Sequence, residues 1–171
     1  MQPAVMKHLL RTRLIAQRTL ITDRQCDQAS RACLRQIMRI DWSTIRTVCM
    51  YSSISRLKEI DTQDILCWIK RTYPKIVVEV IDQSKNAAMP LGQFDLLFIP
   101  VVGFNRGGFR LGMGGGWYDR FLVTQEHAHR VGLAYAWAEL DDLPAEAHDQ
   151  KLDYIVTPTE YIDVSAEKAA A

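Results

Sequence analysis

The chain has 171 residues, which is enough for one buried core, and we expect a single domain over residues 1–171. Its hydrophobic content of 48% and charged content of 24% are ordinary for a soluble globular protein. The formal net charge of +1 creates no overall field for nucleic acid or a membrane surface, so we expect neither as a partner.

Cysteines and the first twenty residues indicate the compartment. The four cysteines form no CxxC pair, which predicts free thiols in a reducing cytoplasm. Basic residues interrupt the apolar residues near the N-terminus, so no signal peptide is expected, and no segment approaches the ~18 apolar residues of a membrane span. A cytoplasmic protein is the resulting expectation.

In chain order, two helices and a strand come first. Apolar residues at helical spacing predict a helix over residues 5–20. Thr22 is typical of a helix cap and predicts a second helix that runs to about Met38. The run "RTVCMYSS" at 46–53 ends in small polar residues, which predicts a buried strand leading into a loop.

The middle of the chain alternates in the same way. Asp61 and Thr62 precede a helix predicted over residues 63–73, and the β-branched run 75–82 predicts a strand. A polar loop is predicted over residues 83–93. The nearly continuous apolar run 94–104 predicts a strand that is covered on both faces.

Towards the C-terminus we expect a helix over residues 117–128, strands over 130–135 and 153–158, and a frayed tail over about 164–171. The alternation predicts an α/β domain in which a largely parallel central sheet is flanked by helices on both faces, a Rossmann-like three-layer arrangement. Ligands bind beyond the carboxyl ends of the strands in such folds.

The segment "RGGFRLGMGGGWYDRFL" at 106–122 lies at that edge, directly after the most apolar strand. Its six glycines leave backbone N–H groups unhindered before a helix, which favours an anion-binding concavity. Arg110 and Arg120 suit phosphate, and Asp119 suits a helix N-terminus or a divalent metal. A flexible surface loop before a capped helix is the alternative. Neither a Walker A loop nor a dinucleotide fingerprint matches the segment.

The block "RLGMGGGWYDRFL" closely resembles the signature of the 5-formyltetrahydrofolate cyclo-ligase (5,10-methenyltetrahydrofolate synthetase) family. Further similarities, weak singly, follow in order over most of the chain outside residues 63–93: "KHLLR" at 7–11, "YSS" and "KEIDT" at 51–53 and 58–62, "FDLLFIPVVGFNRGG" at 94–108, "VGLAY" at 131–135 and "LPAEAHDQKLDYIVTP" at 143–158.

The resemblance implies a reaction with two small-molecule substrates, Mg-ATP and 5-formyltetrahydrofolate. ATP phosphorylates the formyl oxygen, N10 attacks the resulting N5-iminium phosphate, and 5,10-methenyltetrahydrofolate forms with release of ADP and phosphate. Positioning and charge neutralisation do most of the work in such chemistry. A monomer is expected.

By similarity, three groups of residues make up the site. ATP and its phosphates would be bound by Lys7, Arg11, Arg110, Leu111, Gly112, Met113, Gly114, Gly115, Gly116, Trp117, Tyr118 and Asp119. Mg²⁺ would be held by Asp119 and Asp149. Arg110, Tyr118 and Glu59 would act on the reacting groups, Glu59 at a family position that contacts the folate.

Structural alternatives stand beside several of these assignments. Lys7 and Arg11 lie four residues apart, as on any solvated helix face. Asp119 suits an ordinary helix N-terminus, and Asp149 an ordinary polar loop. Glu59 precedes a helix cap, and the two aromatic residues Trp117 and Tyr118 suit a core. The histidines His127, His129 and His148 are not expected to form a metal set.

The chain departs from the family pattern in its middle section. Only 32 residues separate Thr62 from Asp95, and the elements that help shape the folate pocket are not intact there. Asn105 stands at a usual aspartate and Ala138 near a common glutamine, and the spacing from Tyr51 to Glu59 is about two residues long. An alternative function is therefore a diverged relative that keeps the nucleotide site but acts on another substrate, or binds a nucleotide or folate as a regulator.

Overall fold

The computed structural model describes residues 2–83 and 88–165. Its centre is a six-stranded sheet in the order β2-β1-β3-β6-β7-β8, in which only the β7–β8 pair is antiparallel. The elements are α1 (Pro3–Thr19), α2 (Asp23–Ile37), β1 (Thr47–Ser52), α3 (Gln63–Thr72), β2 (Val77–Asp82), β3 (Leu96–Pro100), β4 (Gly103–Phe104), β5 (Arg110–Leu111), α4 (Trp117–Val123), β6 (His129–Leu133), β7 (Tyr154–Val156) and β8 (Tyr161–Asp163).

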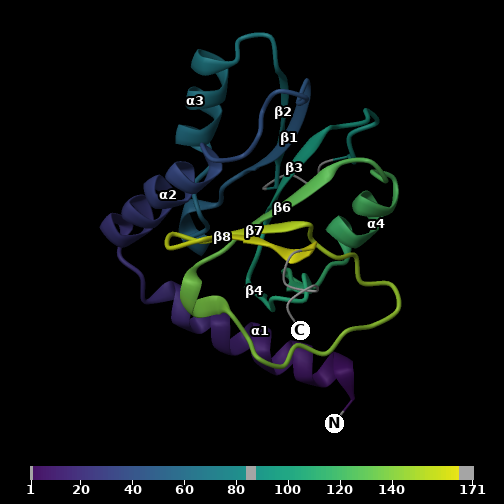
Figure 1. Cartoon of the computed structure of the whole chain (residues 1–171). Helices are drawn as coiled ribbons and strands as arrows, with labels where there is room; N and C mark the ends of the chain where they lie inside the picture. The colour runs from purple at the N-terminus through teal and green to yellow at the C-terminus, as the bar shows by residue number, and fades with distance from the viewer. Residues whose placement is uncertain (1, 84–87, 166–171) are drawn as a thin grey trace.

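Helices α2 and α3 lie on one side of the sheet and α4 lies on the other, so the predicted α/β arrangement is confirmed (Figure 1). Each of the strands β1, β3 and β6 has parallel neighbours on both sides. Helices cover both faces of the sheet, which explains the nearly continuous apolar sequences of β1 and β3. None of the helices in the described part of the chain combines the length and the apolar character that a membrane span requires.

Helix α1 lies across one end of the sheet, beside β4 (Figure 1). Gly103 makes this approach possible, because a Cβ atom there would lie 2.5 Å from Leu14 Cδ1. Helix α2 begins as predicted: the Thr22 hydroxyl accepts from Gln25 N–H at 3.2 Å, and the Gln25 side chain accepts from Thr22 N–H. The chain therefore turns between α1, which lies across the end of the sheet, and α2, which packs on one of its faces.

The strand predicted over residues 94–104 is interrupted. Strand β3 ends at Pro100, and Val102 donates to the carbonyl of Leu111 at 2.8 Å. The chain thereby leaves the main sheet and pairs with β5 as a two-stranded antiparallel hairpin. Apolar runs do not reveal which hydrogen-bond partner a strand will take, so the sequence missed this change of sheet.

Two predictions near the C-terminus were also wrong in extent. Helix α4 ends at Val123 and not at residue 128, because the buried Gln125 side chain instead binds the backbone of Phe94 and Gly92. Strand β8 was not predicted, and it pairs antiparallel with β7. Val164, expected in the frayed tail, is buried, whereas residues 166–171 of that tail and residues 84–87 of the predicted loop lie outside the described residues.

Candidate functional site

A cavity of about 620 Å³ opens at the carboxyl ends of β2 and β3, under α1. Every residue that the resemblance assigns to the site lines it. Arg120, which the sequence also suggested for phosphate, does not line it, and its Nη1 donates to the Gly115 carbonyl at 3.1 Å. The wall consists of Ala4, Lys7, Arg11, Arg18, Glu59, Ile81, Gln83, Pro100, Val101, Val102, Arg110, Leu111, Gly112, Met113, Gly114, Gly115, Gly116, Trp117, Tyr118, Asp119, Glu146, His148 and Asp149.

The glycine loop 112–116 forms the middle of the wall, between β5 and α4. Gly114 has φ of +97°, and a Cβ atom there would lie 3.2 Å from Arg11 Cζ. Arg11 Nε donates to the carbonyl of Gly112 at 2.7 Å, which fixes α1 to the loop. A Cβ atom at Gly112 would meet nothing within 4 Å, so the loop faces open space where a ligand can approach the backbone.

Arg110 and Asp119 bind each other across the loop. Arg110 Nη2 donates to Asp119 Oδ1 at 3.0 Å, and Arg110 Nη1 donates to the carbonyl of Gln150. Gln150 N–H donates to the same Asp119 oxygen at 3.1 Å. Burial lowers the pKa of Arg110 and the Asp119 carboxylate opposes that shift. Asp119 therefore links α4 to the loop around residue 150, in addition to lying in the first turn of its helix.

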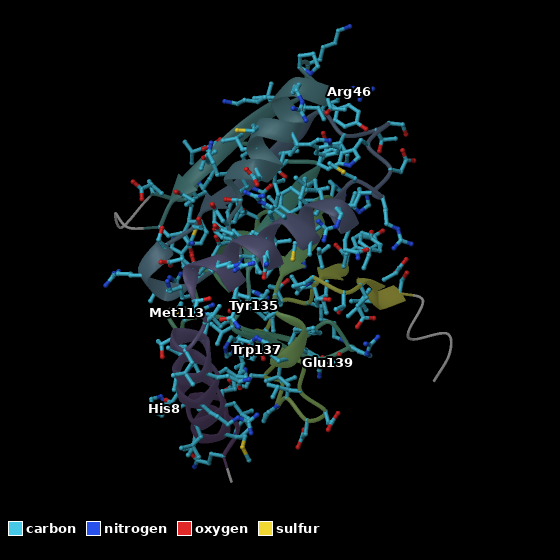
Figure 2. The ribbon with its side chains drawn as sticks, turned by 90° about the vertical axis from the view of Figure 1, so that its left-hand side faces the viewer. His8, Arg46, Met113, Tyr135, Trp137 and Glu139 are labelled. Atoms are coloured by element: carbon cyan, nitrogen blue, oxygen red, sulfur yellow. The ribbon has the colours of Figure 1, made fainter. Side chains whose placement is uncertain are left out.

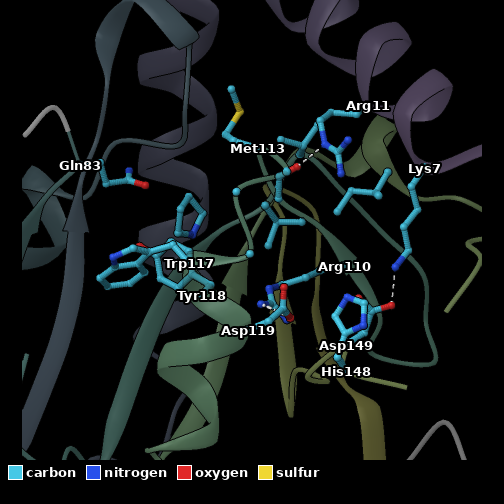
Figure 3. Close-up of a pocket in the computed structure, with 18 of the residues that line it drawn as sticks. Lys7, Arg11, Gln83, Arg110, Met113, Trp117, Tyr118, Asp119, His148 and Asp149 are labelled. Carbon is cyan, nitrogen blue, oxygen red and sulfur yellow. Dashed lines mark hydrogen bonds and ion pairs between the residues drawn. The ribbon is translucent and has the colours of Figure 1, made fainter. Parts of the chain in front are cut away.

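One end of the cavity, here called the lysine end, consists of Lys7, Glu146, His148 and Asp149. Lys7 Nζ lies 2.5 Å from Asp149 Oδ2 and 2.8 Å from Glu146 Oε2. Burial acts to lower the pKa of Lys7, but the two carboxylates outweigh it and the pKa is raised. Figure 3 shows Lys7 pointing from α1 towards the Asp149 and His148 side chains. Lys7 is thus buried in ion pairs and is not part of a solvated helix face.

The lysine end also offers metal ligands. Ligand atoms of Glu146, His148 and Asp149 all lie within 4.8 Å of one another. Asp119 is not part of this group, so the structure places Asp149 with neighbours other than the predicted one. Carboxylate oxygens suit Mg²⁺, which usually takes one or two carboxylates together with substrate phosphates. The pairing of Asp119 with Asp149 stays a prediction.

The opposite end, here called the glutamate end, consists of Arg18, Glu59 and Gln83. Glu59 is 4% exposed, and its Oε2 accepts from Ile54 N–H at 2.8 Å and from Gln83 Nε2 at 3.3 Å. Burial raises the pKa of Glu59, while the Ile54 N–H, Arg18 and Gln83 oppose the shift. Glu59 therefore lies buried in the wall of the site, four residues before α3, with one carboxylate oxygen bound to a backbone N–H and a side-chain amide.

Trp117 and Tyr118 lie between the loop and the glutamate end (Figure 3). Their rings meet edge to face with centroids 4.8 Å apart, and Trp117 also packs on Phe121. The Tyr118 hydroxyl is buried without a hydrogen-bond partner among the described residues, and burial raises its pKa. Both rings thus pack against the hydrophobic core and also line the cavity.

The lining residues missed from the sequence include four polar ones, which are Arg18, Gln83, Glu146 and His148. For Arg18 a signal was present, because it lies seven residues after Arg11 and eleven after Lys7, on the same helical face. Glu146 and His148 lie within the segment 143–158 that took part in the resemblance but were not singled out there, and Gln83 carries no pattern of its own. They reach the cavity only because β2 and the loop around residue 148 end there.

Comparison with known proteins gives a consistent result. The sequence profile of the 5-formyltetrahydrofolate cyclo-ligase family matches residues 79–158. A 5-formyltetrahydrofolate cyclo-ligase of Mycoplasma pneumoniae is 39% identical over 93 residues, which cover 52% of this chain and 56% of the relative. The Escherichia coli K12 enzyme of the same name is 42% identical over 73 residues, covering 42% of this chain and 40% of the relative. The sequence matches thus span less than two-thirds of the length of each of these two relatives.

Solved structures extend the likeness. A structure described as a 5,10-methenyltetrahydrofolate synthetase from Mycoplasma pneumoniae aligns with a TM-score of 0.74 at 25% identity, over 89% of this chain and 98% of the other. One from Aquifex aeolicus, at 20% identity, aligns with a TM-score of 0.76 over 93% of both chains and supports the fold. The resemblance predicted from the glycine block is therefore confirmed.

Proposed function

We propose that this chain, a relative of the 5-formyltetrahydrofolate cyclo-ligases, uses ATP to convert 5-formyltetrahydrofolate into 5,10-methenyltetrahydrofolate, with release of ADP and phosphate. The observation that carries the proposal is the single cavity that joins the glycine loop to Glu59. Its volume of about 620 Å³ falls within the range of small-molecule sites and leaves room for a pterin beside the phosphates. A closed wall between Gly114 and Glu59 would have argued against a folate.

ATP phosphates fit the loop and the lysine end. Backbone N–H groups of the loop, the Arg11 guanidinium and Lys7 together form a donor set for a polyanion. The open space over Gly112 supports this placement, because a side chain there would occupy the volume that a phosphate needs. Arg110 lies behind the loop and would add positive charge as negative charge moves onto the transferred phosphate.

The carboxylates of this region also fit Mg²⁺. Asp149 would hold the ion, with Asp119 or Glu146 as the second carboxylate, and the metal would neutralise phosphate charge during transfer. Lys7 has to release Asp149 for this to happen, and the released ammonium is then available to a phosphate.

At the glutamate end the protein would position the pterin. A carboxylate accepts from two adjacent N–H donors, which the 2-amino and N3 groups of a pterin provide. Trp117 supplies an aromatic wall, and the Tyr118 hydroxyl, which has no partner among residues 2–83 and 88–165, is available to a polar atom of the substrate. With the ring held in this way, the formyl oxygen can face the γ-phosphate and N10 can close the new ring.

The direct test is turnover. Purified chain with Mg-ATP and 5-formyltetrahydrofolate is expected to produce the absorbance of methenyltetrahydrofolate over time, with ADP formed in equal amount. Omission of Mg²⁺ and addition of a chelator should abolish the signal. ADP formation or ATP binding without any methenyl product would instead support a diverged relative that acts on another substrate, a reading favoured by the short section between Thr62 and Asp95.

A further inference from the structure

Arg18 is the residue of the cavity whose environment the proposed phosphate chemistry leaves unexplained. It lies one residue before the end of α1, is only 3% exposed, and lines the cavity. In the described part of the chain its buried Nε has no hydrogen-bond partner, and its Nη2 makes only a weak contact, with Met113 Sδ at 3.9 Å. Among the described residues no carboxylate forms an ion pair with it.

A buried guanidinium in this state is costly for the free protein. Desolvation of a charged group without a partner costs several kcal/mol in proteins, and each unpaired donor adds to that cost. An arginine that served only to hold the fold would be expected to bind an acid or a carbonyl through its Nη groups, as Arg110 does and as Arg130 does even though its Nε is also unpaired among the described residues. Arg18 has neither, so the structure leaves its donors available to a ligand.

The position of Arg18 makes it an unsuitable phosphate ligand. Eleven residues separate it from Lys7 on the same helix, which corresponds to about 16 Å along the axis. Lys7 lies at the lysine end and Arg11 binds the Gly112 carbonyl of the glycine loop, whereas Arg18 meets the Met113 side chain of that loop and lies close enough to Glu59 to oppose the rise in its pKa. Figure 2 shows Met113 and Tyr135 near the carboxyl-terminal end of α1, the region that holds Arg18.

The chemistry of the glutamate end selects the kind of ligand. Arg18 offers only donors and the Glu59 carboxylate offers only acceptors, and together their charges cancel. A neutral ring edge that presents an acceptor beside two donors matches this pair better than an anion, which Glu59 would repel. In a pterin that edge is the C4 carbonyl oxygen beside the N3 and 2-amino N–H groups.

We infer that Arg18 is a specificity-determining residue that donates to the C4 carbonyl oxygen of the pterin while Glu59 accepts from the neighbouring N–H groups. The inference rests on the proposed function and deepens it. It predicts that the protein distinguishes a 4-oxo from a 4-amino pteridine. A 4-amino group would place a donor against the Arg18 donors, and N3 of the neutral 4-amino ring carries no hydrogen for Glu59. Arg18 thereby contributes to the choice of ring and not to the binding of ATP.

The test measures binding in the absence of ATP. Titration calorimetry would compare 5-formyltetrahydrofolate with its 4-amino counterpart on the wild type and on Arg18→Met. We expect Arg18→Met to weaken the 4-oxo ligand by about 10- to 100-fold, the equivalent of one charge-assisted hydrogen bond, and to leave the 4-amino ligand within about twofold. Arg13→Met, an exposed residue of the same helix, should change neither.

A second measurement separates this role from a structural one. Because no carboxylate in the described part of the chain pairs with the buried Arg18 guanidinium, Arg18→Met should raise the melting temperature of the free protein by about 2–4 °C while it lowers affinity. A lower melting temperature together with equal loss of both ligands would overturn the inference. Arg18→Lys, which keeps the charge but loses the planar donor set, should fall between wild type and Arg18→Met in 4-oxo affinity.

Two further outcomes would also overturn it. Weaker binding of Mg-ATP to Arg18→Met with unchanged 4-oxo affinity would assign the residue to the nucleotide. If wild-type protein binds Mg-ATP but neither pteridine, the proposed function itself fails, and the inference fails with it. If wild-type protein prefers the 4-oxo ligand and Arg18→Met prefers it much less, the result supports both the inference and the proposed function.

Discussion

The two ends of the cavity differ in whether their polar groups are already paired. At the lysine end Lys7 binds Asp149 and Glu146, and nearby Arg110 binds Asp119. At the glutamate end the Arg18 Nε has no partner, and the adjoining Tyr118 hydroxyl has none either, among the described residues. A ligand therefore meets paired charges at the lysine end and, in the described part of the chain, unpaired polar groups at the glutamate end.

A ligand at the lysine end has to exchange existing ion pairs, whereas a ligand at the glutamate end forms hydrogen bonds with groups that have no partner among the described residues. Mg-ATP would have to displace Lys7 from Asp149, so part of its binding energy offsets the broken pair. A pterin would instead satisfy donors that the free protein keeps buried and unpaired, and a ligand without the right acceptors would leave them so. We expect discrimination between ligands to arise mainly at the glutamate end.

The largest loss of activity is expected from substitution of Arg110, whose charge is buried behind the glycine loop. Arg110→Ala should lower kcat/KM by about 10²- to 10³-fold, because a preorganised donor near the transferred phosphate is lost. Initial rates of methenyltetrahydrofolate formation measure this. Arg110→Lys should recover only part of the rate, since lysine cannot bind Asp119 and Gln150 together as Arg110 does. Rates within threefold of wild type for Arg110→Ala would remove it from the reaction.

The glutamate end can be tested through pH. Burial raises the pKa of Glu59 above its ordinary 4.5, so the protonated form appears in the free protein at a higher pH than in the unfolded chain. Affinity for 5-formyltetrahydrofolate should be constant above that raised pKa and fall as pH drops through it. Glu59→Gln should weaken binding by about 10- to 100-fold and remove this acid limb.

The same shift has an opposite consequence for folding. Between 4.5 and the raised pKa the folded state binds more protons than the unfolded state, so the free energy of unfolding should fall as pH rises through this window. Urea unfolding across the window would measure the slope. Glu59→Gln should show a flatter profile there, whereas an unchanged slope would mean that other groups produce it.

The ion-pair exchange at the lysine end is expected to show in a metal dependence. Lys7→Ala leaves two carboxylates without their cation and should lower the free energy of unfolding by about 1–3 kcal/mol. Mg²⁺ should then raise the melting temperature of Lys7→Ala more than that of wild type, because the ion no longer competes with the ammonium group. Arg13→Ala is the matched control on the exposed side of α1, and an equal response of Lys7→Ala and wild type would contradict the exchange.

The smallest effect is expected at Gly112. Its Cβ would enter open space, so Gly112→Ala should leave the melting temperature unchanged and raise the KM for ATP a few-fold. Gly114→Ala is the informative comparison, because φ of +97° and the close Arg11 guanidinium make that substitution strained. Similar melting temperatures for the two variants would show that the loop relaxes freely.

Local patterns predicted much of this protein. Apolar runs predicted β1 and the start of β3, a β-branched run predicted β2, and Thr22 marked the start of α2. Burial on both faces, strand propensity and helix capping all leave signals within one segment. The glycine block identified the loop in the same way, since its conformation and its neighbours lie in one continuous stretch. These features depend on residues close together in the chain.

Partnerships across the chain were decided only by the tertiary structure. The sequence could not show that Lys7 would bind Asp149 from 142 residues away, or that Val102 would leave the main sheet to pair with Leu111. Nor could it show that Arg18 would be buried without an acid beside it, because burial and pairing depend on which segments meet at the strand ends. The sequence by itself determined the fold class and the loop that can hold phosphate, and the folding of distant segments around one cavity determined which charges are paired and which are left for a ligand.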